Sequence, residues 1–176
     1  MNDSIKIVIA SATDAPQLSA IAIKTQLETF EKANPPGLSQ AYCDECLNVH
    51  TIENELNTKN SFYYLLKKND DLIGFLKLRT DNVEENKLAG PLSMELQRIY
   101  VLASEKGNGY GKLLLKFAED FAIENGFELL WLGVWEHNSN AISFYQHIGY
   151  QLFGKHDFMY AGDKQTDFMM RKKLTN

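Results

Sequence analysis

The sequence lacks the features that would place it in a membrane, secreted or nucleic-acid-binding class. It has no apolar run near the ~20 residues that span a membrane, and its first ten residues, MNDSIKIVIA, are too short and too acidic for a signal peptide. Basic residues are not in excess, because 18 Lys and Arg against 23 Asp and Glu give a net charge of -5. Non-specific nucleic-acid binding needs a basic surface. We therefore expect a cytoplasmic protein without membrane or nucleic-acid partners.

Cysteines are also scarce. Cys43 and Cys46 are the two in the chain, and with His50 they fall at i, i+3 and i+7 on one face of an expected helix. A structural zinc site needs four ligands, and no second cysteine pair supplies the others. We expect half-buried helix residues and no metal, with a metal or redox role as the alternative interpretation.

The remaining composition is that of one globular domain. Hydrophobic residues make up 44% of the chain and charged residues 23%, which is ordinary for a folded protein. A chain of 176 residues has the size of one domain and buries roughly 70% of its unfolded surface. We expect a single domain over residues 1–176.

Hydrophobic periodicity predicts both strands and helices. Apolar runs such as FELLWLGVW indicate strands, and capping residues, Pro16 and closing glycines bound the helices. The expected strands are residues 5–10, 61–67, 72–79, 94–102, 127–135, 150–160 and 165–174. The expected helices are 15–30, 39–56, 109–125 and 139–147, and 81–91 is an expected loop. The order β-α-α-β-β-β-α-β-α-β-β predicts a single α/β domain with a mixed sheet.

The stretch QRIYVLASEKGNGYGK, residues 97–112, joins an apolar strand to a helix through a loop with three glycines. Gly107, Gly109 and Gly111 let the backbone turn tightly and approach a ligand closely. The N–H groups at the start of the helix lack intrahelical partners and favour anions. The stretch therefore predicts a phosphate-binding loop.

Two common phosphate-binding loops do not match this stretch. A Walker A loop needs G-x-x-x-x-G-K-[ST], but Gly111-Lys112 is followed by Leu113, so the hydroxyl that would bind magnesium is missing. A dinucleotide fingerprint needs G-x-G-x-x-G after the first strand, whereas these glycines are spaced G-x-G-x-G after the fourth. Another kind of phosphate loop is indicated.

The sequence KGNGYG, residues 106–111, resembles motif A of the GCN5-related N-acetyltransferases (GNAT), [QR]-x-x-G-x-[GA], with Lys106 in place of Gln or Arg. Downstream, NSNAISFYQHIGY, from Asn138 to Tyr150, is similar to the family's second signature, N-x-x-A-x-x-x-Y-x-x-x-G-[FY]. Asn138 suits both a helix cap and a hydrogen bond to pantetheine. The resemblance covers nearly the whole chain and is sharpest over residues 94–150.

The resemblance implies the GNAT fold, a mixed and mostly antiparallel sheet of about seven strands flanked by four helices. It also implies acetyl-coenzyme A (acetyl-CoA) as cofactor and coenzyme A as product. In the family, the backbone at the positions of Ile99, Tyr100 and Val101 pairs with the pantetheine amides, and the glycine loop holds the pyrophosphate. The residues expected to bind the cofactor are Ile99, Tyr100, Val101, Lys106, Gly107, Asn108, Gly109, Tyr110, Gly111, Lys112, Asn138 and Tyr145.

The resemblance further implies that an amine attacks the acetyl thioester directly in a ternary complex. Tyr145 matches the family's tyrosine and is expected to protonate the leaving thiolate, since a phenol has a pKa of ~10 and a thiol one of ~8.5. The alternative is a purely structural buried aromatic, which we expect of Phe144. Glu95 lies where several family members keep the base that deprotonates the amine, and Glu136 and His137 are competing candidates.

A narrower similarity concerns the acceptor. WLGVWEHNSNAISFYQHIGY, DKQTDFMMRKKL and TQLETFE resemble the PaiA-type polyamine acetyltransferases. This implies a polyamine such as spermidine or spermine, whose ammonium groups Glu28, Glu31 and Glu136 are expected to bind, although solvated carboxylates are the simpler interpretation. The alternatives are another amine (a protein N-terminus, an amino acid or an antibiotic) and a non-catalytic regulator that binds acetyl-CoA. Pairing of the final strand across a homodimer, as in some relatives, is a further option.

Overall fold

A computed structural model describes residues 3–80, 89–90 and 92–174 of the chain. The chain divides into two compact units, Met1–Lys77 with Arg98–Lys116 (the first unit) and Leu78–Gln97 with Phe117–Asn176 (the second unit). The expected loop at 81–91 lies outside the described residues except for Ala89 and Gly90. The described part of the chain holds no helix that is long and apolar enough to cross a membrane. The expectation of a single domain stays a prediction.

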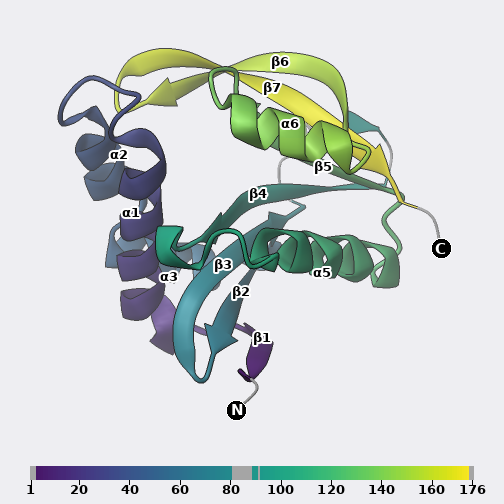
Figure 1. Ribbon diagram of the computed structural model, residues 1–176, viewed down its shortest axis with the longest axis horizontal. Helices are drawn as coiled ribbons and strands as arrows, with labels where there is room; N and C mark the ends of the chain where they lie inside the picture. Colours follow the sequence, from purple (N-terminus) through teal and green to yellow (C-terminus); the bar gives the residue numbers. More distant parts are fainter. Residues whose placement is uncertain (1–2, 81–88, 91, 175–176) are drawn as a thin grey trace. The chain divides into compact units, whose positions relative to one another are not determined.

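The strands form a seven-stranded sheet in the order β1-β2-β3-β4-β5-β7-β6 (Figure 1). The strands are β1 (Ile5–Ile9), β2 (Ser61–Lys68), β3 (Asp71–Arg79), β4 (Ser93–Val101), β5 (Leu129–Trp135), β6 (Gln151–Tyr160) and β7 (Asp163–Lys173). The α-helices of the described residues are α1 (Ala15–Phe30), α2 (Leu38–Cys46), α3 (Val49–Leu56), α5 (Tyr110–Glu124) and α6 (Ser139–His147), with short 3-10 turns η1 (Ala12–Asp14) and η2 (Ala103–Glu105). The predicted class, an α/β fold with a mixed and mostly antiparallel sheet, is confirmed.

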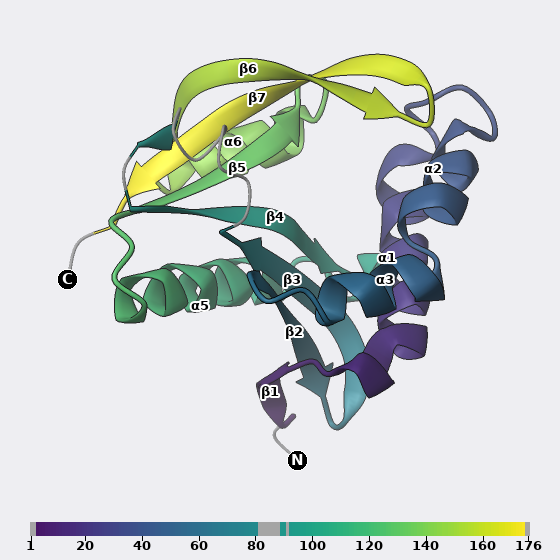
Figure 2. The same ribbon diagram turned by 180° about the vertical axis from the view of Figure 1, so that it is seen from behind.

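The first unit has its own hydrophobic core. Helices α1, α2 and α3 pack against one another (Figure 2). Their buried side chains join apolar residues of β2 and β3 in one cluster, whose largest members include Leu18, Ile52, Tyr63 and Phe75. Burying such side chains is worth about 1.5–3 kcal/mol each, so this cluster fixes the helices against strands β2 and β3.

The helix expected over residues 39–56 is wrong as one element, because the structure breaks it into α2 and α3. Asn48 adopts an extended conformation (φ -65°, ψ 160°), and its side-chain oxygen accepts the N–H of Thr51 at 2.9 Å. Its side-chain amide also donates to the carbonyl of Asp44 at 2.9 Å. Asn48 therefore closes α2 and caps α3, which satisfies backbone groups at both helix ends.

The register of β5, β7 and β6 is set within the second unit. Strand β4 pairs in parallel with β5 from Ser93 opposite Leu129 to Glu95 opposite Trp131. Strands β5 and β6 both pair antiparallel with β7, and a bulge interrupts β6 between Leu152 and Gly154. Trp131 and Met169 are fully buried in a small core with Ala89. Residues far apart in the chain are thus brought into rows across these three strands.

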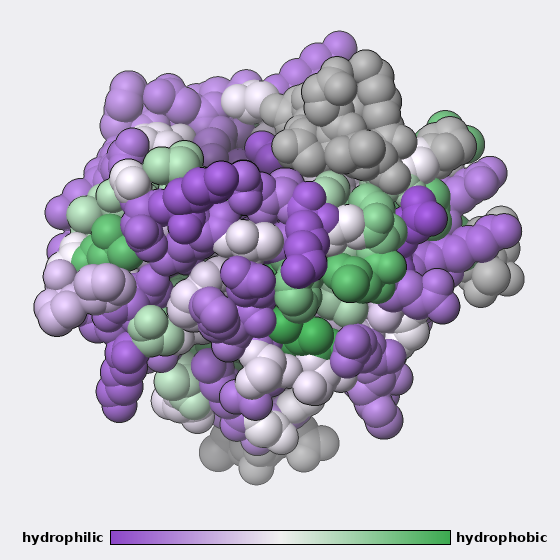
Figure 3. All heavy atoms as spheres, turned by 90° about the horizontal axis from the view of Figure 1, so that it is seen from above, coloured by the Kyte–Doolittle hydropathy of each residue, from purple (hydrophilic) through white to green (hydrophobic). Residues whose placement is uncertain are grey.

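Figure 3 shows a face on which hydrophilic side chains predominate, with apolar side chains gathered between them. The exposed large apolar residues of strand β6 are Leu152 (54% exposed) and Met159 (59% exposed). Isolated apolar residues are common on protein surfaces. The homodimer suggested by the family resemblance therefore stays a prediction.

Candidate active site

The glycine loop of the first unit has the predicted strand–loop–helix arrangement. The backbone N–H of Leu102 donates to the carbonyl of Ile73, and the N–H of Leu113 makes the first turn of α5 with the carbonyl of Gly109. Gly107 and Gly109 have φ angles of +86° and +81°, which favour glycine. A Cβ on either would meet no atom of the described residues within 4 Å. The open loop and the N–H groups at the start of α5 fit a pyrophosphate.

Two carboxylates of the first unit hold this loop. Glu28, on α1, accepts the backbone N–H of Ala103 at 2.8 Å. Glu105 pairs with Lys68 at 3.2 Å, and its backbone carbonyl accepts the side-chain amide of Asn108 at 3.2 Å. Glu28 was expected to bind the acceptor. The structure gives it a structural hydrogen bond, and its contact with the acceptor stays a prediction.

The end of strand β4, where the pantetheine is expected, is fixed by close packing against β3. The ring of Tyr100 stacks on Phe75 with centroids 5.7 Å apart. A Cβ on Gly74 would lie 2.7 Å from the backbone oxygen of Tyr100, so a side chain there would push the strands apart. Ile99 and Val101 are half-buried. Their expected backbone pairing with the cofactor stays a prediction.

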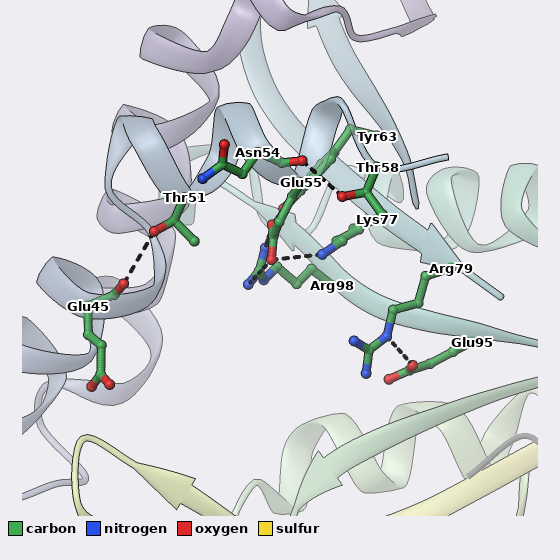
Figure 4. Close-up of polar contacts among 10 residues, drawn as sticks. All are labelled: Glu45, Thr51, Asn54, Glu55, Thr58, Tyr63, Lys77, Arg79, Glu95 and Arg98. Atoms are coloured by element: carbon green, nitrogen blue, oxygen red, sulfur yellow. Dashed lines mark hydrogen bonds and ion pairs between the residues drawn. The ribbon is translucent and has the colours of Figure 1, made fainter. Parts of the chain in front are cut away.

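A buried polar cluster lies in the first unit, formed by Glu55, Tyr63, Lys77 and Arg98 (Figure 4). One oxygen of Glu55 lies 2.9 Å from the Lys77 ammonium, and the other lies 2.6 Å from the Arg98 guanidinium. Tyr63 donates to Glu55 and accepts from Arg98. Burial opposes ionisation of Glu55, but Arg98 and Lys77 outweigh it and lower the pKa of Glu55 to about 2. The sequence did not predict this cluster. Lysine and arginine side chains on a strand are usually expected to lie in solvent, so Lys77 and Arg98 gave no signal of a buried ion pair.

Glu31, the residue that caps the C-terminus of α1, has a buried carboxylate oxygen. Its Oε2 is buried and has no hydrogen-bond partner among the described residues. A buried polar atom without a partner costs about 1–3 kcal/mol, so this oxygen is suited to a donor from a ligand. Its role in the acceptor site stays a prediction.

In the second unit, Glu95 is paired with an arginine that the sequence did not single out. The Nε of Arg79 lies 2.5 Å from Oε2 of Glu95, whose side chain is 7% exposed (Figure 4). This bond links β3 to β4 and fixes the position of the Glu95 carboxylate. The role of Glu95 as base stays a prediction.

Tyr145, on helix α6, is 8% exposed and packs beside Tyr150 with ring centroids 5.7 Å apart. Burial raises the pKa of Tyr145 above its ordinary value, so its phenol keeps its proton at neutral pH. Phe144, expected to be buried, is 37% exposed, because it precedes Tyr145 on the helix and faces outward. Tyr145 can hold a proton for donation, but its role as acid stays a prediction.

The segment between β5 and α6 includes Asn138, which the sequence predicts as a helix cap. The side-chain oxygen of Asn138 accepts the N–H of Ala141 at 3.2 Å and caps α6. The N–H of Glu136 donates to the carbonyl of Thr166, and the His137 ring packs edge-on to Trp135 at 5.1 Å. Cofactor binding by Asn138 and acceptor binding by Glu136 stay predictions.

The two cysteines lie on helix α2, where Cys43 is buried and Cys46 is half-buried. Burial, with smaller contributions from Asp44 and Glu31, raises the pKa of Cys43 to about 11, so the thiol is protonated at neutral pH. Among the residues that the structure describes, no group of three or more His, Cys, Asp or Glu side chains could hold a metal ion.

Comparisons with known proteins identify the family. The model of the acetyltransferase (GNAT) family matches residues 24–150. An uncharacterized N-acetyltransferase of Lactobacillus delbrueckii subsp. lactis is 39% identical over 170 residues, which cover 97% of this chain and 98% of that protein. Streptothricin acetyltransferase of Streptomyces lavendulae is 35% identical over 69 residues, which cover 39% of this chain and 36% of that protein.

A solved structure gives the same fold. The PaiA N-acetyltransferase from Thermoplasma acidophilum in complex with coenzyme A superposes with a TM-score of 0.78 at 24% identity, covering 97% of this chain and 99% of that one. The chain belongs to the GCN5-related N-acetyltransferase family. It is an acyl-CoA-dependent N-acetyltransferase, and acetyl-CoA is its cofactor.

Proposed function

We propose that the protein transfers acetyl groups from acetyl-CoA to a primary amine of a polyamine such as spermidine or spermine. The observation that carries this proposal is the buried oxygen of Glu31, which has no hydrogen-bond partner among the described residues. An ammonium group would satisfy it with a charge-assisted hydrogen bond. The sequence similarity to PaiA-type polyamine acetyltransferases and the net charge of -5 are consistent with a polycationic acceptor.

In the proposed site, residues 106–112 hold the pyrophosphate of acetyl-CoA through backbone N–H groups, with Lys106 and Lys112 as nearby cations. The backbone of Ile99, Tyr100 and Val101 pairs with the pantetheine, and Asn138 adds a side-chain hydrogen bond. Carboxylates of Glu28, Glu31 and Glu136 bind the ammonium groups of the acceptor. The bound cofactor supplies a thioester whose carbonyl carbon an amine can attack.

Proton movements then fall to two side chains of the second unit. Free amines have a pKa near ~10.4 and arrive mostly as ammonium. Glu95 takes this proton, directly or through water, so that the nitrogen lone pair can form the new N–C bond. Tyr145 gives its phenolic proton to the sulfur as the C–S bond breaks, and the second proton that the attacking nitrogen must lose restores the Tyr145 phenol, directly or through water. The products are an N-acetylated amine and coenzyme A with a thiol.

An acceptor screen tests the proposal. We expect turnover with spermidine and spermine, measured as release of the free coenzyme A thiol, and weaker turnover with peptides, amino acids and aminoglycosides. Streptothricin is included because the Streptomyces lavendulae enzyme, 35% identical over 69 residues, is named for it. A clear preference for streptothricin or a peptide over both polyamines would overturn the polyamine proposal.

A Glu31 variant tests whether the buried oxygen of Glu31 contributes to acceptor binding. We expect Glu31→Gln to raise the KM for spermidine at least ten-fold, because it removes a charge worth about 1.5–3 kcal/mol in a hydrogen bond. The Kd of coenzyme A should stay unchanged. Glu45→Gln, an exposed carboxylate on α2, is the control. Equal KM values in the two variants would remove Glu31 from the acceptor site.

A further inference from the structure

Three side chains from separate strands of the second unit form a row across the sheet. Trp135 on β5 lies opposite Asp167 on β7, and Asp167 lies opposite His156 on β6. Directly opposed residues of antiparallel strands project to the same face. The Nε2 atom of His156 is 3.6 Å from Oδ2 of Asp167, and these side chains are 29% and 19% exposed. An aromatic ring, a carboxylate and an imidazole therefore lie side by side, half-open to solvent.

Gly133 leaves space in front of this row. It is the exposed residue in the middle of β5, and the residues on both sides of it, Leu132 and Val134, are buried. A Cβ on Gly133 would lie 3.2 Å from Oδ2 of Asp167 and 3.7 Å from Nε2 of His156. The Asp167 carboxylate thus reaches over a strand residue that has no side chain. A group on a ligand can approach the carboxylate where any other residue would project a side chain.

The chemistry of the row suits an ammonium group. A half-buried carboxylate forms strong, charge-assisted hydrogen bonds with ammonium donors, and a tryptophan face attracts cations. Glu136 follows Trp135 directly in the chain, just after the end of strand β5. Acidic and aromatic groups at one open position disfavour an anionic ligand and favour a cation.

We propose that Gly133, Trp135, His156 and Asp167 form a subsite that binds an ammonium group of the acceptor. Asp167 accepts hydrogen bonds from the ammonium, Trp135 contacts its alkyl neighbours, and His156 is a positioning residue that holds the Asp167 carboxylate. This inference rests on the proposed amine acetyltransferase function, because it names where the acceptor binds.

Steady-state kinetics with spermidine test the subsite. Asp167→Asn should raise the KM for spermidine at least ten-fold, with the Kd of coenzyme A unchanged. Gly133→Ala, which places a methyl group 3.2 Å from the carboxylate, should also raise this KM. The control is Asp157→Asn, an exposed carboxylate of the same hairpin that pairs with Lys164 at 2.7 Å, and it should leave the KM unchanged.

A direct binding measurement separates a lost contact from a damaged fold. Spermidine should shift the imidazole NMR signals of His156 in the wild-type protein bound to coenzyme A, but not in a folded Asp167→Asn variant. If the wild-type enzyme does not acetylate spermidine, the polyamine function fails. If the wild-type enzyme does acetylate it and both Asp167→Asn and Gly133→Ala keep the wild-type KM, the subsite is wrong and the function stands.

Discussion

The glycine loop and the Trp135–Asp167–His156 row are two proposed binding sites that the chain forms in different ways. The loop spans consecutive residues, 106–111, and offers backbone N–H groups at the start of α5. The row draws its residues from three strands and offers side chains. A backbone site depends on conformation, so glycine spacing reveals it in the sequence. A side-chain site depends on register, which becomes visible only once the strands are paired.

Because the two proposed sites differ in this way, we expect substitutions to affect them differently. The largest loss of binding should come from a substitution in the glycine loop. Gly109→Val should weaken coenzyme A binding at least 100-fold in calorimetry, because φ of +81° strains a β-branched residue and its side chain would project into the phosphate site. Lys106→Gln, which restores a family side chain, should change the affinity less than three-fold. A loss of binding in Lys106→Gln as severe as in Gly109→Val would mean that a side chain, not the backbone, holds the pyrophosphate.

A substitution of Tyr145, a buried side chain on α6, tests its proposed role as general acid. Tyr145→Phe should lower kcat about 100-fold, the usual size of a lost general acid, with coenzyme A affinity unchanged. Because burial raises the pKa of Tyr145, its ionisation should not reduce the rate below about pH 10. Tyr150→Phe, which removes a neighbouring phenol bonded to Glu119, should keep kcat within three-fold. Equal rates for Tyr145→Phe and the wild type would exclude Tyr145 as the acid.

A substitution of Glu55 tests whether the cluster of Glu55, Tyr63, Lys77 and Arg98 stabilises the fold. Glu55→Gln should lower the free energy of unfolding by about 3 kcal/mol at pH 7 in urea titrations, because it leaves Arg98 and Lys77 without their shared carboxylate. The native pKa of about 2 lies below the ordinary value of 4.5. The stabilisation is therefore present above pH 4.5 and lost as the pH falls towards 2.

The difference between the Glu55→Gln variant and the wild type should accordingly shrink on acidification. Glu53→Gln, an exposed carboxylate on the same helix, should leave the unfolding free energy within about 0.5 kcal/mol at every pH. A constant difference between wild type and Glu55→Gln from pH 7 to pH 3 would contradict the assignment of the low pKa to Glu55.

Local signals account for most of what the sequence predicted correctly. Strand and helix order, the glycine loop and the Asn138 cap each depend on a few neighbouring residues. The break at Asn48 carried a local signal too, but helical periodicity across residues 39–56 outweighed it. The partners of Glu95 and Glu55 could not be predicted, because Arg79 and Arg98 reach them through strand pairing and helix packing.

The hydrogen bond from the Ala103 amide to Glu28 has a consequence for redesign. It ties α1, which is followed by the proposed acceptor residue Glu31, to the start of the loop that is proposed to hold the cofactor. The proposed acceptor residue and the proposed cofactor loop of the first unit thus depend on the same hydrogen bond. Substitutions at the end of α1 that are designed to alter the choice of acceptor should therefore keep Glu28, because its loss would release the Ala103 amide. A measured change in acceptor specificity could otherwise include a change in the affinity for acetyl-CoA.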